Sequence, residues 1–141
     1  MILVVGLGNP GLEYAKTRHN IGFAALDMIS VRYSFENWKN KLNGHYAKGI
    51  VGEQKTILLK PQTFMNMSGS CVKSFVDYFK IENSNLFVIY DDIDLELGTL
   101  KKKFGGGHAG HNGVKSIFEN LQTSNFYKMR IGVGRPEQKE K

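Results

Sequence analysis

The chain has 141 residues, a mass of 15.9 kDa, a hydrophobic content of 41% and a charged content of 23%, values typical of one globular domain with a single core. Its apolar runs are of strand length, which excludes a membrane-spanning helix, and Met1–Val5 lacks the basic start of a signal peptide. The lone cysteine, Cys71, excludes an internal disulfide, so we expect a reduced, cytoplasmic protein. The net charge of +6 belongs entirely to residues 101–141, because residues 1–100 carry ten basic and ten acidic side chains.

The first half of the chain predicts strands and helices in alternation, with one hairpin between them. The second helix carries apolar residues at the helical spacing i, i+3, i+4, i+7. The expected elements are a strand at Ile2–Val5, a helix at Asn20–Tyr33, two strands at Ala47–Val51 and Thr56–Leu59 joined by a turn at Gly52–Gln54, and a helix opened by Asn66–Gly69.

The second half predicts a buried strand at Leu86–Tyr90, a peripheral strand with lysines at Thr99–Phe104, a helix after Asn112 and a last strand at Tyr127–Val133. We therefore expect residues 1–141 to form one α/β domain, a three-layer α/β/α fold with a twisted mixed sheet. The two most apolar strands, Ile2–Val5 and Leu86–Tyr90, are expected at its centre, so that Asn9 and Asp91 share a crevice at their carboxyl ends.

The glycine-rich turn Gly6–Gly11 matches the dinucleotide-binding pattern G-x-G-x-x-G. That pattern also requires a helix that opens within the turn and an acidic residue about 20 residues further on. Helical periodicity starts only at Ile21, and the acidic candidate Asp27 lies inside that helix. The glycines thus favour close approach of the backbone to a substrate over binding of a nicotinamide, and we expect no cofactor.

Polar side chains gather at the predicted ends of elements. Asparagine amides offer a donor and an acceptor without charge, which suits peptide-like groups or a developing oxyanion. A histidine with a carboxylate partner activates a water molecule. No serine stands in a G-x-S-x-G elbow, so a covalent nucleophile is not indicated. The residues of this set are Asn9, His19, Asn66, Asp91, His111 and Asn112.

Several of these residues have a plainer interpretation. An asparagine such as Asn66 is typical of a helix N-cap, and Asp91–Asp94 is also compatible with a solvated turn or a Mg²⁺ ligand set. The pair His108-x-x-His111 suggests zinc, but no third ligand has a matching spacing, so we expect no metal. Lys101–Lys103 is compatible with a solvated strand end, although its position beside a glycine loop favours phosphate contact.

Six motifs in order resemble those of bacterial-type peptidyl-tRNA hydrolases over essentially the whole chain. They are V-G-L-G-N-P-G, T-R-H-N-I-G, T-F-M-N-M-S-G, D-D-I-D, G-G-G-H-A-G-H-N-G and M-R-I-G-V-G-R-P. The resemblance implies hydrolysis of the ester between a peptide and the 3′ ribose of tRNA, without metal or cofactor. The implied partner is peptidyl-tRNA, and a membrane partner is not implied.

The resemblance also implies residue roles. His19 would be the general base that deprotonates the attacking water, Asp91 would orient His19, and Asn9 would contact the substrate near the scissile ester. Residues implied to bind the peptide, the 3′ end or the body of the tRNA are Tyr14, Phe64, Met65, Asn66, Lys103, His111, Asn112 and Arg130. Lys103 and Arg130 would bind a tRNA phosphate, which agrees with the charge asymmetry.

Members of this family continue beyond the position of Lys141 into a C-terminal segment that packs on the sheet. We expect a chain without it to be a monomer that tends to self-associate through the uncovered face. An alternative function is that of a non-catalytic tRNA-binding or RNA-binding relative that the loss of this segment has inactivated.

Overall fold

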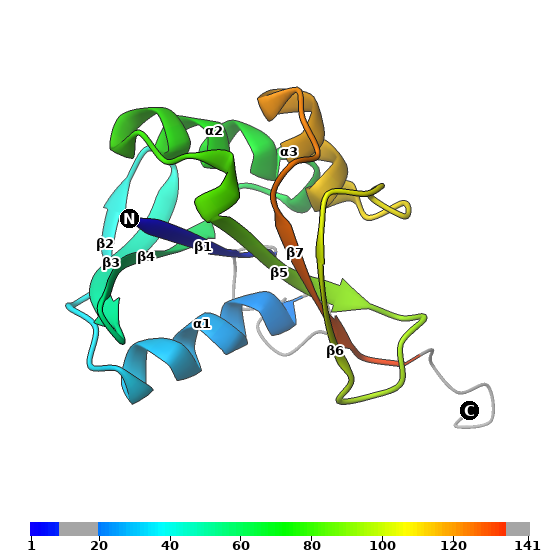
Figure 1. The fold of residues 1–141 in the computed structure, drawn as a ribbon, viewed down its shortest axis with the longest axis horizontal. Helices are drawn as coiled ribbons and strands as arrows, with labels where there is room; N and C mark the ends of the chain where they lie inside the picture. Colours follow the sequence, from blue (N-terminus) through cyan, green and yellow to red (C-terminus); the bar gives the residue numbers. More distant parts are fainter. Residues whose placement is uncertain (9–19, 135–141) are drawn as a thin grey trace.

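The computed structural model describes residues 1–8 and 20–134. These residues form one seven-stranded mixed sheet in the order β2-β3-β4-β1-β5-β7-β6 (Figure 1). The central strands β4, β1, β5 and β7 run parallel, and the antiparallel pairs lie towards the two edges. The strands are β1 (Ile2–Gly6), β2 (Lys39–Lys41), β3 (Gly44–Val51), β4 (Gln54–Pro61), β5 (Leu86–Asp92), β6 (Leu100–Phe104) and β7 (Tyr127–Gly132).

Helices cover both faces of the sheet, α1 on one side and α2 with α3 on the other (Figure 1). Side chains of a strand alternate between the two faces, so the core has two parts. The larger part packs Leu3 and Val88 against Phe75 of α2, and the smaller part packs Ile89 against Leu26 of α1. The helices are α1 (Ile21–Arg32), α2 (Ser68–Phe79) and α3 (Asn112–Leu121), with short 3-10 helices η3 (Met65–Met67) and η4 (Asn83–Asn85).

The predicted α/β fold with a mixed sheet is confirmed, including the central position of β1 and β5 and the edge position of β6. The hairpin strands β3 and β4 are longer than predicted. Strand β2 was not predicted, because Lys39–Lys41 has no apolar residue; it forms by pairing with β3 across a turn in which Leu42 and Asn43 have positive φ values of 53° and 62°.

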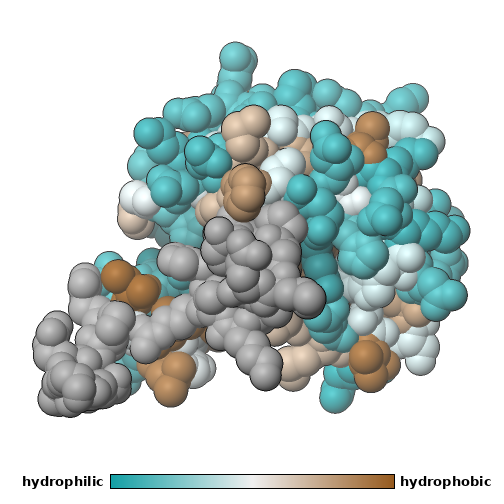
Figure 2. Space-filling view, turned by 180° about the vertical axis from the view of Figure 1, so that it is seen from behind, coloured by the Kyte–Doolittle hydropathy of each residue, from teal (hydrophilic) through white to brown (hydrophobic). Residues whose placement is uncertain are grey.

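Seen from the opposite side, the described surface is largely hydrophilic, and several hydrophobic residues lie near one another at the lower left of the view (Figure 2). Among residues 1–8 and 20–134, no helix is long and apolar enough to cross a membrane. This surface is typical of a domain whose apolar residues are mostly committed to its core.

Candidate active site

Asp91 lies at the carboxyl end of β5 and is 4% exposed. The strand was predicted to end at Tyr90, but it extends to Asp92, because the backbone of Asp91 and Asp92 pairs with Ile131 and Gly132 of β7. This pairing fixes the backbone of Asp91 at the end of the strand. A buried carboxylate requires polar partners.

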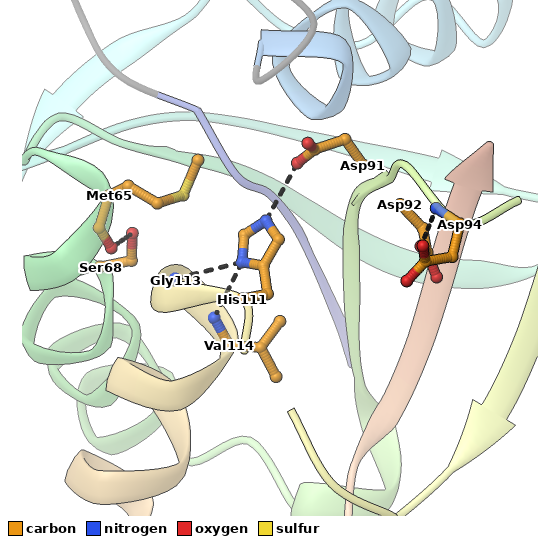
Figure 3. Close-up of polar contacts among 8 residues, drawn as sticks. All are labelled: Met65, Ser68, Asp91, Asp92, Asp94, His111, Gly113 and Val114. Atoms are coloured by element: carbon orange, nitrogen blue, oxygen red, sulfur yellow. Dashed lines mark hydrogen bonds and ion pairs between the residues drawn. The ribbon is translucent and has the colours of Figure 1, made fainter. Parts of the chain in front are cut away.

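One partner of Asp91 is His111, whose Nε2 lies 3.0 Å from Asp91 Oδ1 (Figure 3). His111 is the N-cap residue of α3, and its Nδ1 accepts hydrogen bonds from the backbone N–H groups of Gly113 and Val114 at 3.1 and 3.4 Å. The pairing of Asp91 with His111 was not predicted. The signal that was available is the position of His111 directly before a predicted helix, where a side-chain acceptor satisfies the free amides of the first turn.

Asn66 and Asn112 line one small hollow of about 130 Å³ together with Lys115, Ser116 and Glu119. Asn66 is in η3, and α2 has Met67 as its N-cap without a side-chain cap bond, so Asn66 does not cap that helix. Both asparagines are exposed, and their amides are therefore accessible to a ligand.

The close crossing of α2 and α3 explains why Asn66 and Asn112 meet. A Cβ atom on Gly69 would lie 2.0 Å from the backbone oxygen of Ser116, so only glycine permits this approach. The Gly69 N–H donates a buried hydrogen bond of 2.8 Å to Ser116 Oγ. The contact at Gly69 thus fixes the position of η3 relative to the first turn of α3.

Met65 and Phe64 stand beside the same turn. A Cβ on Gly113 would lie 2.7 Å from Met65 Sδ, so Met65 packs directly against the start of α3, next to His111 (Figure 3). Phe64 immediately precedes η3 and is 60% exposed. An exposed phenylalanine at this place offers a flat apolar surface for a base or an apolar side chain.

Basic side chains line a second hollow of about 470 Å³, which also includes Asp91, Asp92 and His111. Lys103 and Lys128 face each other across β6 and β7, and Arg130 follows two residues later, so all three lie on the same face of the sheet. Arg130 Nη1 is 3.2 Å from Asp92 Oδ2. The predicted pair Lys103 and Arg130 therefore lines one hollow.

Lys128 was not predicted as part of the site, although its alternation with Arg130 along the strand indicates a shared face. It is 2% exposed, and its Nζ donates to the backbone oxygens of Gly105 and Gly106. Burial, and then the nearby charges of Lys103 and Arg130, lower the pKa of Lys128. This buried ammonium holds the glycine loop against the sheet.

His108 uses Nδ1 to accept the N–H of Gly110 at 3.0 Å. Across the parts of the chain that the structure describes, no three histidine, cysteine or acidic side chains converge on one metal position. The described residues therefore offer no ligand cluster for the zinc or magnesium site that the sequence left as an alternative.

Asn9, Tyr14 and His19 lie outside the described residues. The residues on either side of this segment are adjacent, because a Cβ on Gly8 would lie 2.7 Å from Asn20 Oδ1. A Cβ on Gly22, in the first turn of α1, would lie 2.8 Å from the backbone oxygen of Ile89, two residues before Asp91. The chain therefore leaves β1 and enters α1 beside the end of β5.

Comparison with known proteins gives one consistent result. The family model described as peptidyl-tRNA hydrolase matches residues 3–141. The chain is 49% identical over 137 residues to a peptidyl-tRNA hydrolase of Clostridium tetani, and 46% identical over 136 residues to one of Bacillus subtilis. These matches cover 97% and 96% of the chain and 73% and 72% of the relatives. The crystal structure of peptidyl-tRNA hydrolase from Acinetobacter baumannii superposes with a TM-score of 0.91 at 39% identity, covering 99% of this chain and 71% of that one.

Proposed function

The chain belongs to the peptidyl-tRNA hydrolase family, and from this premise we propose that it cleaves the ester of peptidyl-tRNA with a water molecule activated by His19. The activity is that of its relatives, a hydrolase that acts on an ester bond. The observation that carries the mechanism is the position of Asp91. Its buried carboxylate lies at the end of β5, and the first turn of α1 approaches the same strand at Ile89.

In the proposed reaction His19 takes a proton from water, and the resulting hydroxide attacks the ester carbonyl carbon. The tetrahedral intermediate collapses, and the ribose oxygen leaves with the proton from the imidazolium. The peptide departs as a carboxylic acid, which releases its proton to solvent. Asp91 orients His19 and stabilises its protonated form. An ester has a better leaving group than an amide, so an activated water with amide donors suffices.

Substrate binding is assigned to the groups around this centre. Asn9 contacts the substrate near the ester, while Asn66 and Asn112 bind the peptide or the 3′ end through the hollow that they share. Met65, Phe64 and Tyr14 supply apolar and stacking contacts. Recognition of every tRNA body requires phosphate contacts rather than base readout, and we assign these to Lys103 and Arg130.

The buried carboxylate of Asp91 at the end of β5 favours an enzyme over a relative that only binds RNA, because phosphate contacts alone do not require such a group. We further propose that the protein acts in the cytoplasm as a monomeric domain, where its substrate is produced.

The test is hydrolysis of an N-acetylated aminoacyl-tRNA by the chain and by its His19→Ala variant. Loss of a general base lowers the rate by about 10²–10⁴. We expect this fall in kcat with unchanged thermal melting and unchanged tRNA affinity. His45→Asn is the matched control, because His45 lies on β3 and bonds Asn40. Turnover by His19→Ala at the wild-type rate would remove His19 from the mechanism.

A further inference from the structure

We propose that His111 is a positioning residue that fixes the Asp91 carboxylate, and that it does not itself hydrogen-bond the substrate. The inference rests on the proposed function, because Asp91 is the group assigned to orient His19. It differs from the role that the family resemblance implies for His111, which is direct binding of the substrate.

Nδ1 of His111 is an acceptor. Two backbone N–H groups, those of Gly113 and Val114, point at it from the first turn of α3 (Figure 3). An N–H group donates, so Nδ1 must present its lone pair, and the proton of the neutral ring lies on Nε2. Nε2 then donates to Asp91 Oδ1 at 3.0 Å. The helix start thereby selects the tautomer that the carboxylate requires.

The ring is also fixed on its faces and edges. Tyr90 packs against it with a centroid separation of 4.8 Å and an interplanar angle of 63°. A Cβ on Gly113 would lie 3.2 Å from His111 Cε1, and Met65 packs at the same place. The His111 side chain is 12% exposed. A ring held in this way cannot turn to a ligand without losing the cap of α3.

Both nitrogens are thus used inside the protein, and the ring joins two elements of the site. Through Nδ1 it sets the start of α3, whose first residue is Asn112. Through Nε2 it sets Asp91 at the end of β5. The distance between the substrate-binding amide and the orienting carboxylate is therefore defined by one imidazole. A catalytic group displaced by about 1 Å loses about 10²-fold in rate.

Two variants separate the two bonds of the ring. The amide oxygen of asparagine occupies the place of Nδ1, and asparagine is a preferred N-cap, so His111→Asn keeps the cap and loses the bond to Asp91. The amide of glutamine reaches the place of Nε2, so His111→Gln keeps a donor to Asp91 and loses the cap. The test measures kcat and KM for N-acetylated aminoacyl-tRNA, together with Tm, for the unmodified chain and both variants.

For His111→Asn we expect kcat to fall by about 10- to 100-fold, with KM and Tm unchanged. For His111→Gln we expect most of kcat to remain, with a Tm lower by about 3–6 °C. In an Asp91→Asn background His111→Asn should cost nothing further, because it acts through Asp91. His45→Asn serves as the control for histidine replacement away from the site.

Wild-type kcat in His111→Asn would overturn the proposal. A rise in KM at constant kcat would also overturn it and indicate direct substrate contact. Equal losses of kcat in the two variants, in step with Tm, would indicate a purely structural role. Multiplying losses in the double variant would mean that His111 acts independently of Asp91. Failure of the proposed function is distinct, because the unmodified chain would then not hydrolyse the substrate, or His19→Ala would retain turnover.

Discussion

Replacement of Gly69 by alanine tests how the helices form the amide-lined hollow. The new Cβ would lie 2.0 Å from the backbone oxygen of Ser116 and 2.4 Å from its carbonyl carbon. Backbone atoms cannot rotate away, so α2 and α3 must separate, and such overpacking costs about 1–3 kcal/mol. Separation also weakens the buried bond from Gly69 N–H to Ser116 Oγ, which adds about 1–3 kcal/mol. Alanine favours a helix by about 1 kcal/mol and offsets a part of this cost.

We therefore expect Gly69→Ala to lower the free energy of unfolding by about 1–5 kcal/mol, and Tm by about 4–20 °C. Thermal melting measures this, and KM for N-acetylated aminoacyl-tRNA should rise because Asn66 moves away from Asn112. Gly107→Ala is the matched control, since a Cβ there meets nothing within 4 Å. A Tm for Gly69→Ala equal to or above that of the unmodified chain would show that the helix contact is not as close as the structure indicates.

The remaining predictions concern the basic residues Lys103, Lys128 and Arg130, which lie on the same face of β6 and β7. Lys103→Ala and Arg130→Ala should each reduce the salt slope of tRNA binding by about one unit, and leave hydrolysis of a minimal ester without a tRNA body unchanged. Arg130→Ala should weaken tRNA binding more than Lys103→Ala does, because it also removes the Arg130 partner of the Asp92 carboxylate, which then repels the phosphate. Equal tRNA affinities of the two variants would contradict that reasoning. The pKa of Lys128 is lower in the folded chain than in the unfolded chain, so the unfolded chain binds this proton more tightly. The free energy of unfolding therefore rises with pH between the lowered pKa of the folded chain and the ordinary value of 10.5. Lys128→Met should remove part of that rise in alkaline melting curves, and an identical pH dependence would contradict the effect.

Local patterns in the sequence predicted the elements that have a strong hydrophobic period. The stripe of α2 and the apolar run of β5 were recognised for this reason, and both lie in the core. Strand β2 and the polar extension of β5 through Asp92 were not predicted, because backbone pairing with a neighbouring strand of the sheet creates them. Such pairing depends on the partner strand rather than on the side chains of the segment itself, so no period within the segment reveals it.

The same distinction holds within the candidate site. Residue types and motifs pointed to Asp91, His111, Asn66 and Asn112 one by one, since each stands at the end of an element. They could not assign the partner of His111, because the ring lies between a strand end and a helix start that are 20 residues apart in sequence. The geometry of the helix start determines the partner of His111. Because α3 starts at Asn112, the free N–H groups of its first turn donate to His111 Nδ1, and Nε2 is left to bond the Asp91 carboxylate. The role of a histidine in such a site therefore follows from which of its nitrogens the backbone has already used.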